Sequence, residues 1–365
     1  MTNLARWIFA GMICTPIAAQ ADRGAFDIDR WYNMQESVRN RALAENISQS
    51  VIDDTFRNAA FIPAIVKSDA NQSEFKLTLD GYLDRTVSQT RIAQGKKMRM
   101  KYPTLLSRVE KKYGVPPHVM LAFWGMESNY GVVKSRHQLT HAFLTLMYDG
   151  RRETFFGNQL IALMKIADKN KQDINNIHGS WAGAMGHFQF IPTTLTQYGA
   201  DGNGDKKIDI INNITDAMFS AGNYLNNLGW NKNEKIVRQV VLPGDFDLSM
   251  LDGKTKLTLP QWAALGVTNP DGTPIPQNEM VAGLVADVAT ISAEREAIQQ
   301  ATIAAQTQAQ TDNTPDSPVV AMDTDVAPMP VITAYLTYPN FYRIKKWNNS
   351  NWYAIAIAKL ADQLH

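Results

Sequence analysis

One apolar segment, "PPHVMLAFWGMESNYG" at 116–131, constrains the fold most, because it is the most hydrophobic stretch with helical character in the chain. Pro116 and Pro117 suit the first turn of a helix. Gly131 suits the position just beyond a helix end. The pattern therefore predicts a buried helix from Val119 to Asn129 and a fold built around helices.

This predicted helix ends in a single carboxylate, Glu127. At 3.6 residues per turn, Glu127 shares the apolar face with Phe123 and Trp124. Desolvation and the negative end of the helix dipole both disfavour the charged form, so the pKa of Glu127 should be raised. A carboxyl group with a raised pKa can act as a general acid near neutral pH. The alternative is a structural ion pair with an arginine such as Arg136 or Arg151.

Composition describes a globular chain without a strong charge bias. The 365 residues include 45% hydrophobic and 19% charged residues, enough to bury a large core, and the formal net charge is +1. Removal of the first 21 residues takes away only Arg6 and leaves 35 basic and 35 acidic residues. A neutral chain of this kind is not typical of nucleic-acid-binding proteins, so we expect no nucleic-acid partner.

The N-terminus has the pattern of an export signal at 1–21. Arg6 precedes the apolar run Trp7–Ile17, and small residues lead to a cleavage position near Ala21. The run is too short to span a bilayer, so no membrane anchor is expected. The only cysteine, Cys14, lies inside the signal, and a mature chain without thiols suits an oxidising compartment. The alternative is a buried first helix.

Unusual residue combinations are concentrated between Tyr102 and Trp230, so chemistry is expected there. After Trp262 no aromatic residue occurs until Tyr335, and aromatic, motif-like sequence then resumes. An apolar helical end that returns after a low-complexity stretch favours an insertion over a linker. We therefore expect one domain at 22–365, with 279–330 as a low-complexity or partly helical insertion.

Two patterns occur inside this insertion. Helical spacing, which predicts an amphipathic helix, is kept by Val281, Leu284, Val285, Val288 and Ile291. The stretch Gln299–Pro318 is rich in Gln, Ala, Thr and Pro and is predicted to be a flexible loop.

Three separated motifs carry a family resemblance. They are "AFWGMESNYG" at 122–131, "HGSWAGAMGHFQFIPTTLTQYGADGNGD" at 178–205 and "NFYRIKKWNNSNWYAIAIAKLAD" at 340–362. In this order they resemble the lytic transglycosylase B family of peptidoglycan-cleaving enzymes, glycoside hydrolase family 103. The resemblance implies a mostly α, lysozyme-like helical core with a small antiparallel β element, α+β overall, and a location in the periplasm.

The resemblance also implies a reaction for Glu127. It would donate a proton to the glycosidic oxygen between N-acetylmuramic acid and N-acetylglucosamine, and then accept the proton of the muramic acid C6 hydroxyl as that oxygen closes on C1. An intramolecular hydroxyl replaces water, so a second carboxylate is not needed. The alternatives are a hydrolytic muramidase, with Asp149 or Glu153 as second carboxylate, and a peptidoglycan-binding protein without turnover.

Six further residues match positions that contact glycan in this family. They are Tyr82, Ser180, Gln189, Trp347, Asn348 and Tyr353. The resemblance implies that Asn348 and Tyr353 bind the N-acetyl group and C6 region beside Glu127. Without it, the glycine-rich 180–190 segment is equally typical of helix packing. The C-terminal motif is then a core helix with its cap, and Tyr82 a surface aromatic.

The segment "DGNGDKKIDIIN" at 201–212 has the spacing of an EF-hand calcium loop. The predicted ligands are Asp201, Asn203, Asp205, the carbonyl of Lys207, Asp209 and Asn212. Lys206 stands where the sharp turn normally has Gly, and Asn212 replaces the usual bidentate Glu. We expect a structural calcium ion that the chemistry does not require, with a solvated Asp/Gly turn as the alternative.

Overall fold

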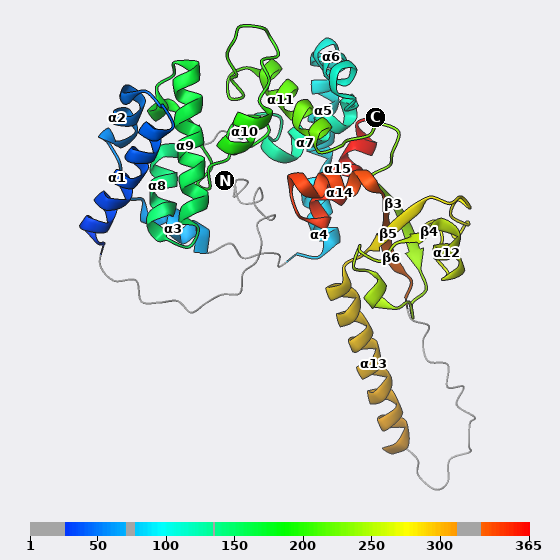
Figure 1. Cartoon of the computed structure of the whole chain (residues 1–365). Helices are drawn as coiled ribbons and strands as arrows, with labels where there is room; N and C mark the ends of the chain where they lie inside the picture. The colour runs from blue at the N-terminus through cyan, green and yellow to red at the C-terminus, as the bar shows by residue number, and fades with distance from the viewer. Residues whose placement is uncertain (1–25, 71–76, 134–135, 312–329) are drawn as a thin grey trace, which may run out of the picture. The chain divides into compact units, whose positions relative to one another are not determined.

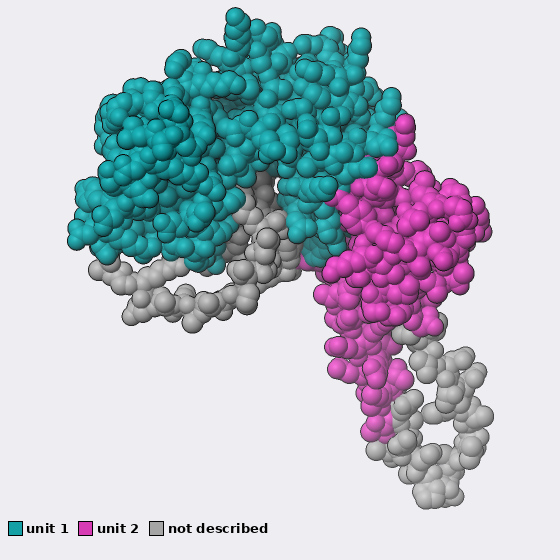
Figure 2. All heavy atoms as spheres, viewed as in Figure 1, with its two compact units in different colours: residues 1–76, 83–232, 343–365 teal, residues 77–82, 233–342 magenta. Residues whose placement is uncertain are grey.

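The computed structural model describes residues 26–70, 77–133, 136–311 and 330–365. The predicted export signal at 1–21 lies outside these residues. The chain forms two compact units (Figure 2). Unit 1 takes its described residues from 1–76, 83–232 and 343–365, and unit 2 from 77–82 and 233–342. No helix in the described part of the chain is long and apolar enough to cross a membrane.

Unit 1 is built from helices, which confirms the mostly α prediction (Figure 1). Its helices are α1 (Ile28–Ala44), α2 (Gln49–Arg57), α3 (Pro63–Ala70), α5 (Gln89–Lys101), α6 (Pro103–Tyr113), α7 (Pro117–Ser128), α8 (Leu139–Asp149), α9 (Glu153–Asn170), α10 (Pro192–Tyr198), α11 (Ile214–Asn227) and α15 (Asn351–Gln363). Two helices continue from one unit into the other, α4 (Leu79–Thr86) and α14 (Pro339–Trp347). The strands β1 (His137–Gln138) and β2 (His178–Gly179) form a small antiparallel pair.

Helix α7 packs against four other helices of unit 1, namely α5, α6, α11 and α15. It starts with Pro117 in its first turn and ends at Ser128. The next three residues, Asn129, Tyr130 and Gly131, all have left-handed backbone conformations with φ of 49°, 61° and 80°. The helix predicted for Val119–Asn129 is confirmed, but the residue that ends it is Asn129 rather than Gly131.

Helix α15 packs along α7 because its inner face carries small side chains. Ala354, Ala358 and Ala361 share one face of the helix and are all buried, so the helix can approach its neighbours closely. The Ser350 side chain accepts a hydrogen bond from the Tyr353 backbone N–H and so starts the helix. The C-terminal motif is therefore a core helix with its cap, and this cap also fixes the position of Tyr353.

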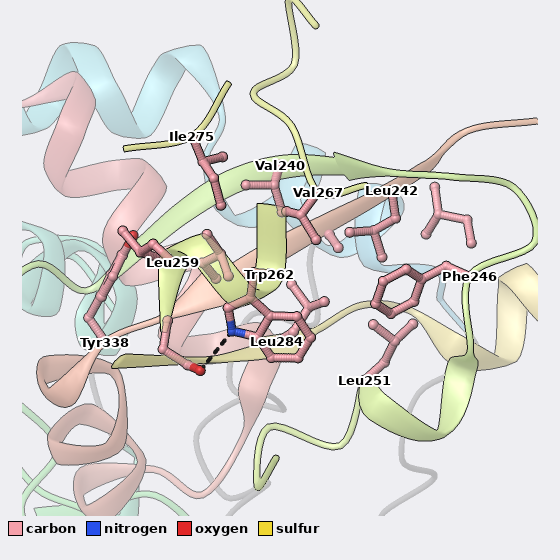
Figure 3. Close-up of a cluster of buried hydrophobic side chains, with 14 of the residues drawn as sticks. Val240, Leu242, Phe246, Leu251, Leu259, Trp262, Val267, Ile275, Leu284 and Tyr338 are labelled. Carbon is pink, nitrogen blue, oxygen red and sulfur yellow. Dashed lines mark hydrogen bonds between the residues drawn. The ribbon is translucent and has the colours of Figure 1, made fainter. Parts of the chain in front are cut away.

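Unit 2 contains a four-stranded antiparallel sheet. Its strands are β3 (Val237–Leu242), β4 (Leu257–Thr258), β5 (Val281–Val285) and β6 (Ile332–Thr337), in the order β3-β6-β5-β4. The core around the sheet centres on Trp262 of α12 (Leu259–Ala264), whose indole N–H donates to the Ala282 carbonyl at 3.0 Å (Figure 3). Trp262, the last aromatic residue in the sequence before Tyr335, is therefore a core residue of unit 2.

The helix predicted across 281–291 is wrong in its first part. Residues Val281–Val285 form β5, and α13 begins only at Val288. β5 lies between β4 and β6, so four of its five residues are buried, and a short apolar run of this kind fits a buried strand as well as a helix.

The prediction of a flexible loop from Gln299 onward is also wrong for residues 299–311, which belong to α13 (Val288–Thr311). Ala and Gln are strong helix formers, which outweighs the low complexity of the sequence. Residues 312–318 of the predicted loop lie outside the described residues. The domain bounds 22–365 and 279–330 stay predictions.

Candidate active site

Glu127 is the second-to-last residue of α7, and it is 4% exposed. The helix around it is buried on nearly all sides, from Val119 to Gly125. A carboxyl group at this position loses most of its hydration. Because this burial costs free energy, a carboxyl group is unusual in this helix, the most apolar of unit 1.

Two donors bind one oxygen of this carboxyl group. The Trp347 indole N–H donates to Glu127 Oε1 at 2.9 Å, and the Tyr353 hydroxyl donates to the same oxygen at 2.5 Å. Trp347 is the last residue of α14 and Tyr353 lies in the first turn of α15, so the two donors flank the short connection between these helices. The structure thus brings three of the predicted site residues together.

The environment sets the protonation of Glu127. Burial raises its pKa to about 7, while the hydrogen bonds from Tyr353 and Trp347 oppose the shift. Because both donors occupy Oε1, the proton of the acid belongs on Oε2, which has no partner in the described part of the chain. The predicted rise in pKa is therefore present, and burial is its largest cause.

The arginine-paired alternative does not fit the observed contacts. No ion pair reaches Glu127 within the described residues, and Arg136 is exposed. Arg151 instead binds the carboxylates of Asp69 and Asp149, each at 2.6 Å. Glu127 is consequently a buried acid held by neutral donors.

An aromatic surface continues from the Trp347 ring. Its centroid lies 4.9 Å from Phe123 and 4.9 Å from Tyr224 of α11. Tyr224 in turn stacks on Tyr198 at the end of α10, with 4.6 Å between centroids and 27° between planes. Flat aromatic faces are suited to the apolar faces of sugar rings. Neither Tyr198 nor Tyr224 is among the residues predicted from the sequence.

The glycine-rich segment 180–190 is not a helix-packing motif, because it forms turns between β2 and α10. The Ser180 hydroxyl accepts from the Ala184 N–H at 3.0 Å, and Gln189 Nε2 donates to the Gly186 carbonyl at 2.8 Å. Gly183 has a φ of +96°, and a Cβ there would lie 2.2 Å from the Phe143 ring. The small residues are thus needed for the turn itself. Neither predicted side chain hydrogen-bonds to Glu127.

Asn348 follows Trp347 directly and is 6% exposed. Its Oδ1 is buried and has no hydrogen-bond partner among the described residues. A buried acceptor without a donor is costly, so this oxygen is suited to a ligand N–H group.

Tyr82 belongs to unit 2 and is 4% exposed, so the alternative of a surface aromatic is wrong for this residue.

The acidic loop brings three carboxylates together, though not the predicted set. Carboxylate oxygens of Asp201, Asp205 and Asp216 lie within 4.8 Å of one another. Asp209 and Asn212 instead hydrogen-bond to each other at 3.0 Å. Asp216 is not among the predicted ligands, because it lies four residues beyond the end of the 12-residue pattern, in the first turn of α11.

One carboxylate of this cluster is disfavoured in its charged form. Burial first, and the nearby charge of Asp201 as well, raise the pKa of Asp216, while backbone N–H groups oppose the shift. Lys206 adopts the left-handed conformation, with a φ of 69°, that a glycine usually supplies in such loops. A cluster of carboxylate oxygens suits Ca²⁺, which prefers oxygen ligands.

Comparison with known proteins decides the family. The Transglycosylase SLT domain family matches residues 30–297 and 287–362. The chain belongs to this family. The chain is also similar to the membrane-bound lytic murein transglycosylase B of Escherichia coli (strain K12), 26% identical over 287 residues, which are 77% of this chain and 66% of that protein. The aligned part thus covers slightly less than two thirds of the E. coli protein.

Solved structures support the same assignment. SltB3 from Pseudomonas aeruginosa has a TM-score of 0.75 and 31% identity, with 92% of this chain and 79% of that chain covered. SltB1 from the same organism has a TM-score of 0.71 and 23% identity over 91% of this chain and 98% of that chain, which shows the shared fold. The fold predicted from the three motifs is therefore confirmed.

Proposed function

We propose that this chain is a periplasmic lytic transglycosylase that cleaves the bond between N-acetylmuramic acid and N-acetylglucosamine in peptidoglycan and leaves 1,6-anhydro ends. The observation that carries the proposal is the buried Glu127, with Oε1 bound by Trp347 and Tyr353 and a pKa raised to about 7. SltB3, which is 31% identical to this chain, was solved in complex with NAG-anhNAM-pentapeptide.

In this reaction Glu127 Oε2 gives its proton to the glycosidic oxygen, and the bond between that oxygen and C1 breaks. The C6 hydroxyl oxygen of the muramic acid then bonds to C1, and its proton returns to Glu127. No water is consumed, so the acid is regenerated within one cycle. Trp347 and Tyr353 stabilise the carboxylate between the two proton transfers, when Oε1 carries charge.

The remaining predicted residues receive binding roles. The unpartnered Oδ1 of Asn348 would accept the N–H of an acetamido group. Ser180 and Gln189, whose side chains hydrogen-bond within their turn, are proposed as further glycan contacts on the family resemblance. Tyr82 is proposed as a glycan contact on the family resemblance alone.

A hydrolytic muramidase would need a second carboxylate for water. The two candidates are poorly suited to that role. Asp149 is bound by Arg151, and Glu153 is exposed in the first turn of α9. The transglycosylase reaction, which needs one carboxylate, is therefore preferred.

Replacement of Glu127 by Gln tests the assignment of the acid. The amide keeps the shape but has no proton to give, so turnover of isolated peptidoglycan should fall by roughly three or more orders of magnitude while glycan binding persists. A Glu153→Gln variant is the matched control and should retain wild-type turnover. Full activity in Glu127→Gln would refute the proposal.

The location follows from the predicted signal. We propose export and cleavage near Ala21, so that Edman sequencing of the periplasmic protein should start near Asp22. A periplasmic protein that retains Met1 would contradict this.

We also propose a structural calcium ion in the 201–216 loop. The carboxylates of Asp201, Asp205 and Asp216 would hold it, with Asn203 and the Lys207 carbonyl as predicted further ligands. Slt35 of Escherichia coli, which shares the fold at 22% identity, was solved in complex with calcium. The ion would stiffen the loop before α11, and the chemistry at Glu127 would not require it.

A further inference from the structure

Two consecutive helices of unit 1 hold an unusual excess of positive charge. Helices α5 and α6, which pack against each other and against α7, contain eight basic residues and one acidic residue, Glu110 (Figure 1). The whole chain has 36 basic and 35 acidic residues, so its neutrality hides this local imbalance. We refer to residues 89–113 as the basic hairpin.

Seven of the eight basic side chains are exposed. They are Lys96, Lys97, Arg99, Lys101, Arg108, Lys111 and Lys112. None of the seven has a carboxylate within ion-pair distance in the part of the chain that the structure describes. Like charges held this close repel one another, and nothing described in unit 1 neutralises them.

The exposed face of α5 also carries an apolar side chain. Met100 is 76% exposed, the highest exposure among the large hydrophobic residues of the described chain. Lys96 and Lys97 lie four and three residues before it, so they flank it on the same face, and Lys101 follows it directly. The exposed Met100 thus shares one face of α5 with two lysines.

The helix dipole explains only part of this pattern. Basic residues in the last turn of a helix interact favourably with its dipole, which accounts for Arg99 and Lys101 in α5 and for Lys111 and Lys112 in α6. Arg108 donates to the Gly202 carbonyl at 2.8 Å, which gives it a structural role, whereas Lys96 and Lys97 lie further from the helix end and have no such bond among the described residues. Met100 gains nothing from the dipole.

We propose that the basic hairpin binds the surface of a bilayer that contains anionic phospholipids. The lysine ammonium groups would contact headgroup phosphates, and Met100 would enter the boundary between headgroups and acyl chains. Clusters of this size on a helix surface are suited to anionic lipid, and long basic side chains can reach the headgroups while the helix lies on the membrane. An anionic glycan polymer would satisfy the charges but not the exposed Met100. The proposal does not depend on the chemistry at Glu127.

The test is co-sedimentation of the full chain with vesicles of phosphatidylcholine alone and with ~30% phosphatidylglycerol added. Wild type should bind only the anionic vesicles, and ~0.5 M NaCl should release it, because salt screens exposed charges. The variant Lys96→Glu/Lys97→Glu/Lys101→Glu should bind at least tenfold more weakly. Met100→Ala should weaken binding by a smaller factor at low salt.

A matched control changes the same charge elsewhere in unit 1. Lys67→Glu/Lys169→Glu/Lys232→Glu alters three exposed lysines outside the hairpin and should bind like wild type. Both triple variants should unfold at wild-type temperature and cleave soluble glycan fragments normally. Equal vesicle binding by the two variants would overturn the proposal. So would loss of binding to isolated peptidoglycan, but not to vesicles, in the hairpin variant, since the partner would then be the anionic wall polymer.

Discussion

The Tyr353 hydroxyl lies 2.5 Å from Glu127 Oε1, although 226 positions separate the two residues in sequence. The Trp347 indole donates to the same oxygen, so Oε1 holds two hydrogen bonds while Oε2 has no partner among the described residues. Burial and these two bonds act on the pKa in opposite directions, and burial is the larger effect. The acid therefore stays protonated up to about pH 7.

Tyr353→Phe removes the donor that most strongly lowers the pKa of Glu127. The pKa should rise above about 7, and the alkaline limb of the pH–rate profile should move to higher pH. Turnover should fall roughly 10- to 100-fold, because the carboxylate formed after proton donation loses a charge-assisted bond. Kinetics on soluble glycan from pH 5 to 9 would measure both effects. An unchanged alkaline midpoint would show that the Tyr353 hydroxyl does not set the pKa of Glu127.

Trp347→Phe should act in the same direction with a smaller shift in the alkaline midpoint. The phenyl ring keeps contact with Phe123 and Tyr224 but cannot donate to Glu127. Tyr198→Phe is the control, since its hydroxyl has no bond to the carboxyl group. An alkaline midpoint that moves to lower pH in Trp347→Phe would contradict a role of the indole N–H in lowering the pKa of Glu127.

Glu127→Gln should change the pH dependence of stability. Since the folded pKa of Glu127 is raised from 4.5 to about 7, the folded state binds this proton more tightly than the unfolded chain. The free energy of unfolding therefore falls as pH rises from 4.5 to 7, by roughly 3 kcal/mol from this group alone. The Gln variant lacks this loss, so its unfolding free energy relative to wild type should rise with pH. Urea titrations at pH 5 and pH 8 test this, and an equal difference at both pH values would contradict it.

Calcium should raise the thermal midpoint once its concentration exceeds the dissociation constant. Asp205→Ala should abolish this response, because Asp205 belongs to the carboxylate cluster. Asn212→Ala should retain it, since Asn212 binds Asp209 instead. Differential scanning calorimetry with and without millimolar calcium would separate the two. A response lost in both variants would favour the ligand set predicted from the sequence, which contains Asn212 as well as Asp205.

Local sequence signals predicted the position of the acid. The prolines before α7, its apolar length and the charge at its end are all features of neighbouring residues, and they identified Glu127 without the structure. The donors Trp347 and Tyr353 came from the family resemblance. Their contact with Glu127 depends on the packing of α15 on α7, which no local pattern encodes.

Features that depend on distant partners were missed or misread. Residues Val281–Val285 are a strand because β4 and β6 pair with them on either side. Tyr224 joins the site through the Trp347 ring, 123 positions away in sequence. Asp216 completes the carboxylate cluster only because the loop folds back onto the start of α11. In each case tertiary contact, rather than intrinsic propensity, decides the outcome.

The mass of the muramic acid product tests the central claim most directly. When wild-type enzyme digests isolated peptidoglycan, the C6 hydroxyl rather than water should attack C1, so each product should end in 1,6-anhydro-N-acetylmuramic acid. Such products are lighter than hydrolytic ones by one water, which mass spectrometry resolves, and Glu127→Gln should release neither. We predict anhydro products alone. Products with a reducing end would show that water is the nucleophile and would contradict a reaction that rests on Glu127 as the single carboxylate.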